Sequence, residues 1–371
     1  SAVTEAYLNP ILRQYLDSVG KGMGAGGELL VMSSAGGLID QGGYRAIDSL
    51  LSGPAGGVVG AGATARAAGI KEFINLDMGG TSSDVSRYSG SFAYQSAHQV
   101  GDARISSVAM KIETVAAGGG SICRIENGLL RVGPQSAGAH PGPACYGFGG
   151  PLCLTDVNLL LGRLDPSRFS TPVSLEDAQG RLAEMVEQSG RSSEELLEGF
   201  LAVADDAMAN AIRKVSTAEG YDPSEHALQT FGGAGGQHAC GVARRLGMQR
   251  IFSPADSGLL SAYGLSQARI ERVVERSVLG PVDPQALGQM EEEMTAFGLS
   301  ALEKLGQQGK VAGKSAFVRL LGQDVPLEIE YSQTQEIESL YRKKFQRVFG
   351  YFPTGRELEV HSLRLLVAGA S

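Results

Sequence analysis

The sequence predicts an α/β fold with a mixed sheet, followed by a separate α+β module towards the C-terminus. Apolar runs at 73–76 and 227–231 each end in a glycine-rich loop, and the second loop leads into a helical pattern. Further strand-like runs follow the first loop directly as a meander, so parallel and antiparallel neighbours are both expected. From about residue 280 glycine becomes rare and a charged helix begins, which indicates a new module.

Composition limits the functional class. The 371 residues include 52 glycines, which is about twice the usual ~7%, and they gather beside apolar runs, as in loops where backbone meets a ligand. The net charge of −8 argues against nucleic acid as the main partner, whereas backbone N–H groups and a metal can still bind a nucleotide. The four cysteines form no C-x-x-C pair, which favours a reduced, cytoplasmic setting. We find no signal peptide or membrane-spanning run and expect no membrane partner.

The chain opens with a predicted helix, Val3 to Leu16, which Pro10 is expected to kink or restart. A strand, Glu28 to Met32, follows and ends in Ser33-Ser-Ala-Gly-Gly37. A later strand ends in the similar Gly232-Gly-Ala-Gly-Gly236. This similarity has two interpretations, a faint internal duplication or a coincidence between glycine-rich loops.

The stretch from Phe73 to Ser86 is the candidate centre of the site. Its first strand delivers a carboxylate, a Gly-Gly-Thr turn follows, and a second carboxylate precedes the strand Val85–Tyr88. A carboxylate at a strand end beside such a turn can hold a hydrated Mg²⁺ against nucleotide phosphates. The alternative is an ordinary hairpin with a glycine turn. The residues concerned are Asp77, Gly79, Gly80, Thr81 and Asp84.

Two loops in the middle of the chain leave their roles open. Gly118-Gly-Gly-Ser121 precedes a strand, Ile122 to Ile125, and is either a structural turn or a ligand loop. The long loop from Gly133 to Gly150 contains His140 and Cys145, with Tyr146 beside them. A nucleophilic cysteine needs a histidine base within reach. The alternative is that this triplet serves loop packing or contact with another part of the protein.

The remaining elements follow from periodicity and capping signals. Thr155 and Asp156 are expected to cap a helix, Val157 to Leu164. Ser174 and Ser192 open two longer helices. A further helix is expected at 58–68, and the second of the two longer helices should bury the face formed by Leu197, Leu201, Ala204, Met208, Ala211 and Val215. A βαβ unit is expected from the strand 227–231, the helix 237–246 and the strand 250–253. The expected C-terminal elements are 284–305, 315–321, 325–331, 334–349 and 358–367.

The order of these motifs resembles one lobe of the actin, sugar-kinase and heat-shock ATPase superfamily, in which ATP lies between two RNase-H-like lobes. More narrowly, five motifs resemble the hydantoinase/oxoprolinase family, above all its ATP-hydrolysing 5-oxoprolinases. They cover roughly residues 50 to 265. The motifs are Leu51–Gly57, Leu76–Thr81, Thr114–Ser121, Ser136–Tyr146 and Phe231–Cys240.

The resemblance implies an ATP-dependent, Mg²⁺-dependent hydrolase that opens a small cyclic amide, 5-oxoproline, to glutamate, a step of glutathione metabolism. Asp77 would hold Mg²⁺, while Gly79, Gly80 and Thr81 would bind β/γ-phosphate oxygens. Asp77, Thr81 and Asp84 would be the catalytic residues, with Asp84 bracing the turn or a water molecule of the metal. The alternative for Asp84 is a structural cap of the hairpin. Adenosine would lie against Gly232, Gly233, Gly235 and Gly236, and Gly118, Gly119 and Gly120 would approach phosphate or substrate. His238 would cap or pack.

Three further functions stay open at this point: an N-methylhydantoinase, an acetone- or acetophenone-type ketone carboxylase subunit, or, from another class, a non-catalytic nucleotide-responsive scaffold. The family begins with another lobe carrying its own Asp-x-Gly-Gly-Thr hairpin, which does not precede residue 73 here. Residues 1–47 are therefore expected to be the tail of that first lobe, 48–278 the second RNase-H-like lobe and 279–371 the α+β module. The expected partners are the first lobe, a hydantoinase B-type half or subunit, and further copies in a homo-oligomer. This chain alone is expected to be inactive.

Overall fold

The computed structural model describes residues 2–24, 29–95, 98–100, 103–105, 107–169, 172–353 and 355–369. The chain forms two units. Unit 1 comprises Ser1–Ala55, Gln95–Ala109 and Ala268–Ser371. Unit 2 comprises Gly56–Tyr94 and Met110–Gln267 and carries every candidate site residue. None of the described helices combines the length and the hydrophobicity that a bilayer crossing requires.

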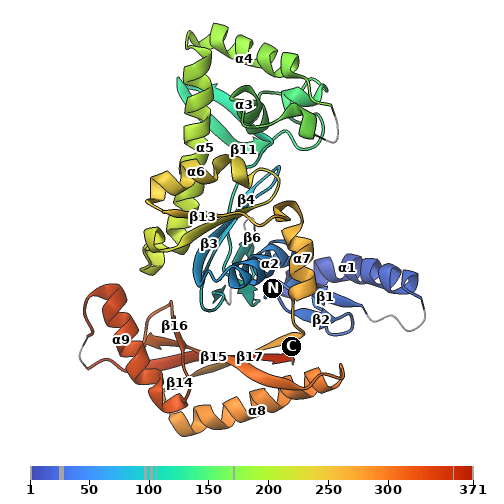
Figure 1. Cartoon of the computed structure of the whole chain (residues 1–371). Helices are drawn as coiled ribbons and strands as arrows, with labels where there is room; N and C mark the ends of the chain where they lie inside the picture. Colours follow the sequence, from blue (N-terminus) through green and yellow to red (C-terminus); the bar gives the residue numbers. More distant parts are fainter. Residues whose placement is uncertain are drawn as a thin grey trace. The chain divides into compact units, whose positions relative to one another are not determined.

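A five-stranded sheet forms the centre of unit 2, in the order β13-β12-β3-β4-β9 (Figure 1). β3 (Glu72–Met78), β4 (Ser83–Ser89) and β9 (Glu113–Val115) form an antiparallel meander. β12 (Ala227–Phe231) lies parallel to β3, and β13 (Arg250–Phe252) lies parallel to β12. The predicted α/β class and mixed sheet are confirmed.

The two faces of this sheet pack against different helices. Alternate residues of β3, such as Ile74 and Leu76, join the large core formed with α5 (Ser193–Val215) and α6 (Gly235–Leu246). On the other face Phe73 packs against α2 (Ser52–Ala67). Asp77 has the parity of Phe73, so its side chain lies on the α2 face. The predicted apolar face of α5 is buried throughout.

Beyond the sheet, an antiparallel hairpin of β10 (Ser121–Glu126) and β11 (Leu129–Ser136) packs against α3 (Leu154–Leu160) and α5. α4 (Leu175–Ser189) packs in turn against these two helices. Ser174 accepts a hydrogen bond from the N–H of Asp177, and Ser192 forms a capping box with Glu195, so both predicted helix starts are confirmed.

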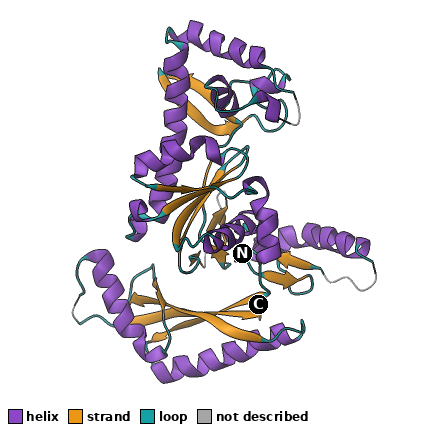
Figure 2. Ribbon diagram, viewed as in Figure 1, coloured by secondary structure: helices purple, strands orange, loops and turns teal. Residues whose placement is uncertain are grey.

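Unit 1 contains a second sheet, with antiparallel neighbours in the order β14-β17-β15-β16, against which α8 and α9 pack (Figure 2). The predicted C-terminal helices and strands are present. Their bounds are β14 Glu271–Pro281, α8 Pro284–Glu303, β15 Gly309–Leu320, β16 Leu327–Glu330, α9 Ile337–Phe349 and β17 Leu358–Gly369. Other elements of the chain are α1 Ala2–Gly22, β1 Leu30–Met32, β2 Leu38–Asp40, η1 Ala46–Ser49, β5 Tyr94–Gln95, β6 His98–Val100, β7 Ala103–Ile105, β8 Ala109–Met110 and α7 Leu260–Gln267.

Two expectations for the N-terminal segment need correction. The helix does not restart at Pro10, because α1 continues through it; Pro10 is exposed, and water can satisfy the carbonyl group that loses its donor. A kink at Pro10 stays a prediction. The segment Ser33–Gly37 is a tight turn between antiparallel β1 and β2, in which the N–H of Ser33 donates to the carbonyl of Gly37. The similar segment at 232–236 joins a strand to a helix, so the two loops are not structural repeats. Glu28, the predicted strand start, lies outside the described residues.

Two boundaries also differ from expectation. The predicted limit at residue 278 falls inside β14, which pairs with β17 and therefore belongs to the C-terminal sheet. α3 begins at Leu154 rather than Val157, with Cys153 as its N-cap residue. Asp156 lies one turn inside the helix and accepts the N–H of Cys153, so it acts from the third helical position and not as the cap itself.

Candidate functional site

The predicted hairpin is present where β3 and β4 meet. Asp77 and Asp84 face each other across the two strands. The N–H of Gly79 donates to the carbonyl of Ser82 over 3.0 Å and closes the turn. Gly80 and Thr81 form its exposed tip. One strand therefore delivers a carboxylate beside a glycine turn, in the geometry that the sequence predicts.

Two glycines from other elements make room for the carboxylate of Asp77. A Cβ atom on Gly57 of α2 would lie 3.2 Å from Oδ2, and one on Gly232 would lie 2.5 Å from Oδ1. Burial, together with the charge of Asp84, raises the pKa of Asp77 to about 6. No hydrogen bond to this carboxylate is present among the described residues. A bound cation would offset the cost of keeping it charged there.

Asp84 has the partner that Asp77 lacks. The hydroxyl group of Thr114 in β9 donates to its Oδ1 over 2.6 Å. Burial raises the pKa of Asp84, and the hydrogen bond from Thr114 opposes that rise. The contact ties the hairpin to the next strand, which fits the bracing role. A catalytic role for Asp84 stays a prediction.

The tip of the hairpin presents hydrogen-bond donors. In the part of the chain that the structure describes, no acceptor is present for the N–H of Gly80 or for the N–H and hydroxyl group of Thr81. A Cβ atom on Gly80 would meet nothing within 4 Å, and its φ angle is not positive. Folding alone therefore does not require glycine at position 80. Close approach of a ligand to bare backbone is a physical reason for it.

The second glycine loop lies beside this carboxylate. Phe231 at the end of β12 is paired with Asp77, and the N–H of Ala234 donates to the carbonyl of Met78 over 3.0 Å. α6 begins at Gly235, directly after the loop. The structure thus brings together the two motifs that the sequence assigns to phosphate and adenosine, although more than 150 residues separate them.

The four glycines of this loop fall into two pairs. Gly232 has a φ of +80°, and a Cβ atom there would collide with Asp77 and the backbone of Met78. A Cβ atom on buried Gly235 would lie 2.5 Å from Thr230 Oγ1. These two are therefore required by packing. Gly233 and Gly236 are exposed and have nothing within 4 Å, so contact with a ligand remains as the explanation for glycine there.

The third loop, Gly118 to Gly120, is buried against the hairpin. The N–H groups of Gly119 and Gly120 donate to the carbonyls of Gly79 and Gly80 over 3.0 and 2.6 Å. The N–H of Gly118 donates to Ser121 Oγ, and a Cβ atom on Gly118 would lie 2.6 Å from the backbone of Thr81. The loop supports the hairpin through backbone contacts that only glycine allows. Direct ligand binding by it stays a prediction, and these three N–H groups are already used.

The proline-rich loop does not bring His140 and Cys145 together. The ring of His140 packs against Phe148, with 5.4 Å between the centroids, and no hydrogen bond joins it to Cys145 among the described residues. Cys145 is fully buried, and burial with the nearby Asp156 carboxylate raises the pKa of its thiol strongly. Asp156 accepts the N–H groups of Ala144, Cys145 and Cys153 and so organises the loop. These contacts favour the packing interpretation.

Thiol reactivity tests this interpretation. Cys240 is exposed, whereas Cys123, Cys145 and Cys153 are buried, and burial raises the pKa of each buried thiol. We expect one thiol per folded chain to react quickly with a chromogenic disulfide reagent, and the fast phase to disappear in Cys240→Ser. A second fast thiol that survives this substitution would show an accessible, reactive cysteine in the loop.

His238 is fully buried in the first turn of α6. Its Nδ1 lies 2.8 Å from Asp205 Oδ1 of α5, and its Nε2 lies 3.0 Å from Asn158 Nδ2 of α3. The expected packing role is therefore confirmed. Sequence reasoning missed both partners, because neither lies at a local spacing from His238.

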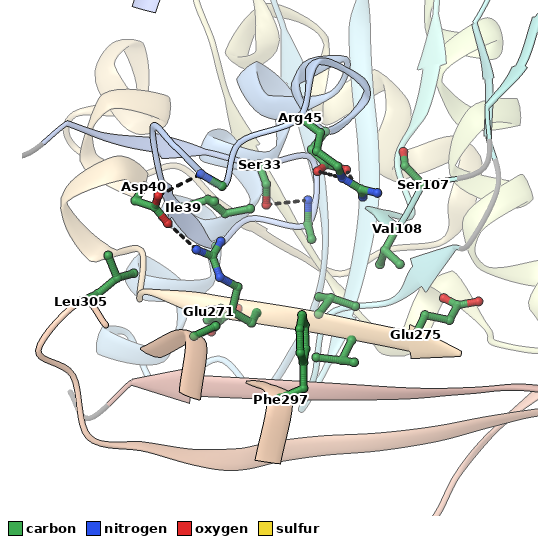
Figure 3. Close-up of a pocket in the computed structure, with 18 of the residues that line it drawn as sticks. Ser33, Ile39, Asp40, Arg45, Ser107, Val108, Glu271, Glu275, Phe297 and Leu305 are labelled. Carbon is green, nitrogen blue, oxygen red and sulfur yellow. Dashed lines mark hydrogen bonds and ion pairs between the residues drawn. The ribbon is translucent and has the colours of Figure 1, made fainter. Parts of the chain in front are cut away.

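A separate cavity of about 970 Å³ lies in unit 1, and Figure 3 shows Asp40, Glu271 and Phe297 on its walls. Arg272 donates to Asp40 over 2.5 Å. Burial raises the pKa of Glu271 to about 7. No residue of the hairpin or of the glycine loops at 118–120 and 232–236 lines this cavity, so the candidate nucleotide site does not depend on it.

Comparison with known proteins identifies the family. The hydantoinase/oxoprolinase profile matches residues 1–274. This chain belongs to the hydantoinase/oxoprolinase family. Within it, the 5-oxoprolinase of Dictyostelium discoideum is 33% identical and matches 99% of this chain. The 5-oxoprolinase PfmaA of Pestalotiopsis fici is 44% identical over 73% of this chain. The relatives are thus named as enzymes, as predicted.

A solved structure shares the fold of this chain. The crystal structure of ATP-dependent caprolactamase from Pseudomonas jessenii has a TM-score of 0.87 and 28% sequence identity, and covers 98% of this chain. This chain covers 57% of that caprolactamase chain and 32% and 22% of the two 5-oxoprolinases. It therefore spans about half of the former and at most a third of the latter.

Proposed function

We propose that unit 2 is the second RNase-H-like lobe of an ATP-dependent cyclic-amide hydrolase that opens 5-oxoproline to glutamate. The observation that carries the proposal is that the hairpin carrying Asp77 lies beside the open glycines Gly233 and Gly236, which follow the neighbouring strand β12. The sheet, a meander followed by two parallel strands, supports the lobe assignment. The 5-oxoprolinase relatives support the substrate.

An amide is a poor electrophile because resonance delocalises its nitrogen lone pair. In the proposed reaction the lactam carbonyl oxygen attacks the γ-phosphorus of ATP, the bond to the β-phosphate oxygen breaks, and ADP leaves. Water then adds to the activated carbon, and the C–N bond of the ring opens to give the amine and an acyl phosphate. A second water molecule hydrolyses the acyl phosphate to the carboxylate and free phosphate. Such phosphoryl transfer needs positioning and charge neutralisation rather than a protein nucleophile, which fits the buried thiol of Cys145.

The residues of the hairpin divide this task. The free donors of Gly80 and Thr81 would bind phosphate oxygens, with Gly79 shaping the turn. Asp84, held by Thr114, would keep the hairpin in place beside Asp77. Gly233 and Gly236 would lie against the flat face of adenine, and Gly118 to Gly120 would hold the hairpin from behind.

The donor set fits Mg²⁺. Asp77 supplies hard oxygen atoms with no other partner among the described residues, and Asp84 lies opposite. No group of three or more metal-ligating His, Cys, Asp or Glu side chains is found in the described ranges. Mg²⁺ commonly uses one or two carboxylates together with water and substrate phosphates. When bound, it would neutralise phosphate charge, and Asp77 would hold it directly or through water.

Substrate-dependent phosphate release from the full-length parent protein tests the proposal. We expect release with 5-oxoproline to exceed release with caprolactam, N-methylhydantoin, or acetone plus bicarbonate. Preference for caprolactam would favour the activity named for the caprolactamase structure. Preference for N-methylhydantoin would favour an N-methylhydantoinase, and preference for acetone would favour a ketone carboxylase subunit. Nucleotide binding without turnover of any of these compounds would favour a scaffold.

The exposed apolar face of α1 indicates that unit 1 binds a partner. Four apolar residues at a spacing of four lie on one side of this helix and are 64–84% exposed, namely Val3, Tyr7, Ile11 and Tyr15. The carboxylate of Glu5 accepts the N–H groups of Ala46 and Ile47, so the helix is tied to unit 1. We infer that this stripe packs in the parent protein against the first ATPase lobe.

This inference predicts the behaviour of the 371-residue chain by itself. Because the first lobe would form the other wall of the ATP cleft, we expect this chain by itself to show no 5-oxoproline-dependent phosphate release and a dissociation constant for MgATP above the micromolar range. Isothermal titration calorimetry measures the affinity. Micromolar binding by the isolated chain would contradict the need for the first lobe.

A further inference from the structure

α3 contacts two neighbours of the candidate site. One is the loop 118–120, which supports the hairpin, and the other is the start of α6, which follows the glycine loop 232–236. Thr155 in its first turn donates to the carbonyl of Gly119 twice, from its N–H over 2.8 Å and from its hydroxyl over 2.9 Å. Gly119 in turn donates its N–H to the carbonyl of Gly79 in the hairpin. A single residue therefore separates α3 from the phosphate hairpin.

One turn further along α3, Asn158 contacts His238 in α6, the helix that follows the other glycine loop. Its Nδ2 donates to the carbonyl of Leu154 over 3.0 Å, which fixes the orientation of the amide, and lies 3.0 Å from Nε2 of His238. The carboxylate of Asp205 can only accept, so the proton of the neutral ring is on Nδ1 and Nε2 accepts from Asn158. His238 comes two residues after Gly236 in the first turn of α6.

Stability alone is a poor explanation of this network. Asn158 and His238 are buried in a core that is otherwise largely apolar. Oδ1 of Asn158 is buried without a hydrogen-bond partner, which costs free energy. A leucine would fill a similar volume without that cost. Buried hydrogen bonds do, however, fix one relative orientation of the elements that they join.

We propose that Thr155, Asn158 and His238 are positioning residues that set the spacing between the phosphate hairpin and the N-terminus of α6. The proposal rests on the nucleotide site proposed above and adds the element that holds its two halves in register. None of the three side chains would touch ATP. Thr155 acts through the backbone of Gly119, and Asn158 acts through the ring of His238.

Paired substitutions with matched controls test the proposal. Thr155→Val removes the hydroxyl at constant shape, and Thr155→Ser restores it. Asn158→Leu removes the amide, and Val157→Ala in the same helix creates a cavity without removing a hydrogen bond. We expect Thr155→Val and Asn158→Leu each to weaken MgATP binding by about tenfold. The loss of affinity in the double variant should be smaller than the product of the two single losses. Thr155→Ser and Val157→Ala should keep wild-type affinity, although Val157→Ala lowers the melting temperature.

Amide hydrogen exchange gives a readout that needs no nucleotide. In the 371-residue chain, Thr155→Val should speed exchange in the peptide 77–84, and Asn158→Leu in the peptide 232–240, beyond the change caused by Val157→Ala. Equal effects of all three substitutions on exchange would overturn the proposal. If wild-type protein binds no MgATP even at millimolar concentration, in the chain and in its full-length parent, the proposed function fails, and the exchange data still decide whether α3 positions the loops.

Discussion

Asp77→Asn is expected to reduce 5-oxoproline-dependent phosphate release by roughly 10³-fold or more in the full-length parent protein. The substitution keeps the shape of the side chain between Gly57 and Gly232 and removes only the charge that would hold Mg²⁺. Phosphate release with and without 5-oxoproline is the measurement. Undiminished turnover would rule out the metal-binding role of Asp77.

The same substitution is expected to make the protein more stable at pH 8. Burial and Asp84 raise the pKa of Asp77 to about 6 in the folded state, above the usual ~3.9 of an unfolded chain. The folded state therefore binds more protons between these values, and the free energy of unfolding falls as pH rises through this window. Above about pH 6 the destabilising contribution of the charged carboxylate is fully present.

Asn removes that contribution, so we expect Asp77→Asn to gain on the order of 1–2 kcal/mol at pH 8. The gain should shrink as pH falls from 6 to 4. Thermal unfolding of both proteins across this range measures it. Asp165→Asn is the control, because Asp165 is an exposed carboxylate that accepts the N–H of Ser167 and is far from the hairpin in sequence. The Asp165→Asn variant should keep full activity. A less stable Asp77→Asn at pH 8 would show that the carboxylate has a stabilising partner.

Alanine substitutions at two adjacent glycines should affect different properties, the first lowering folding stability and the second lowering nucleotide affinity. Gly232→Ala places a Cβ atom 2.5 Å from the carbonyl oxygen of Met78 on a backbone with φ of +80°, so we expect a loss of about 2–4 kcal/mol of folding free energy. Gly233→Ala meets open space and should fold like the wild type. Because a methyl group there would lie between the backbone and adenine, its affinity for MgATP should fall at least about tenfold.

Circular dichroism melting and nucleotide titration of the parent protein separate the two effects. Gly180→Ala is the matched control, since Gly180 is exposed within α4 and also has nothing within 4 Å. It should keep the affinity and gain about 0.5–1 kcal/mol of stability from helix propensity. Wild-type nucleotide affinity in Gly233→Ala would remove the adenosine assignment from this loop.

Local sequence predicts most of the site's parts. The carboxylate before Gly79 and Gly80 is a strand end followed by a turn, and both signals lie within a few residues. The strand–loop–helix at 227–246 is equally local. By contrast, the sequence does not place β14 in the C-terminal sheet, because its partner β17 lies about ninety residues later. Its membership is decided by pairing rather than by composition.

The motifs, their order and the family that they define can therefore be recognised from local sequence. Which glycines are needed for packing depends on contacts between elements that are distant in the chain. Gly118 and Gly232 lack room for a Cβ atom because distant backbone lies against them, whereas Gly80 and Gly233 have room. Tertiary structure also decided that Asn158, His238 and Asp205 meet. Spacing along the chain reports one element at a time, and close approach between elements depends on how they pack.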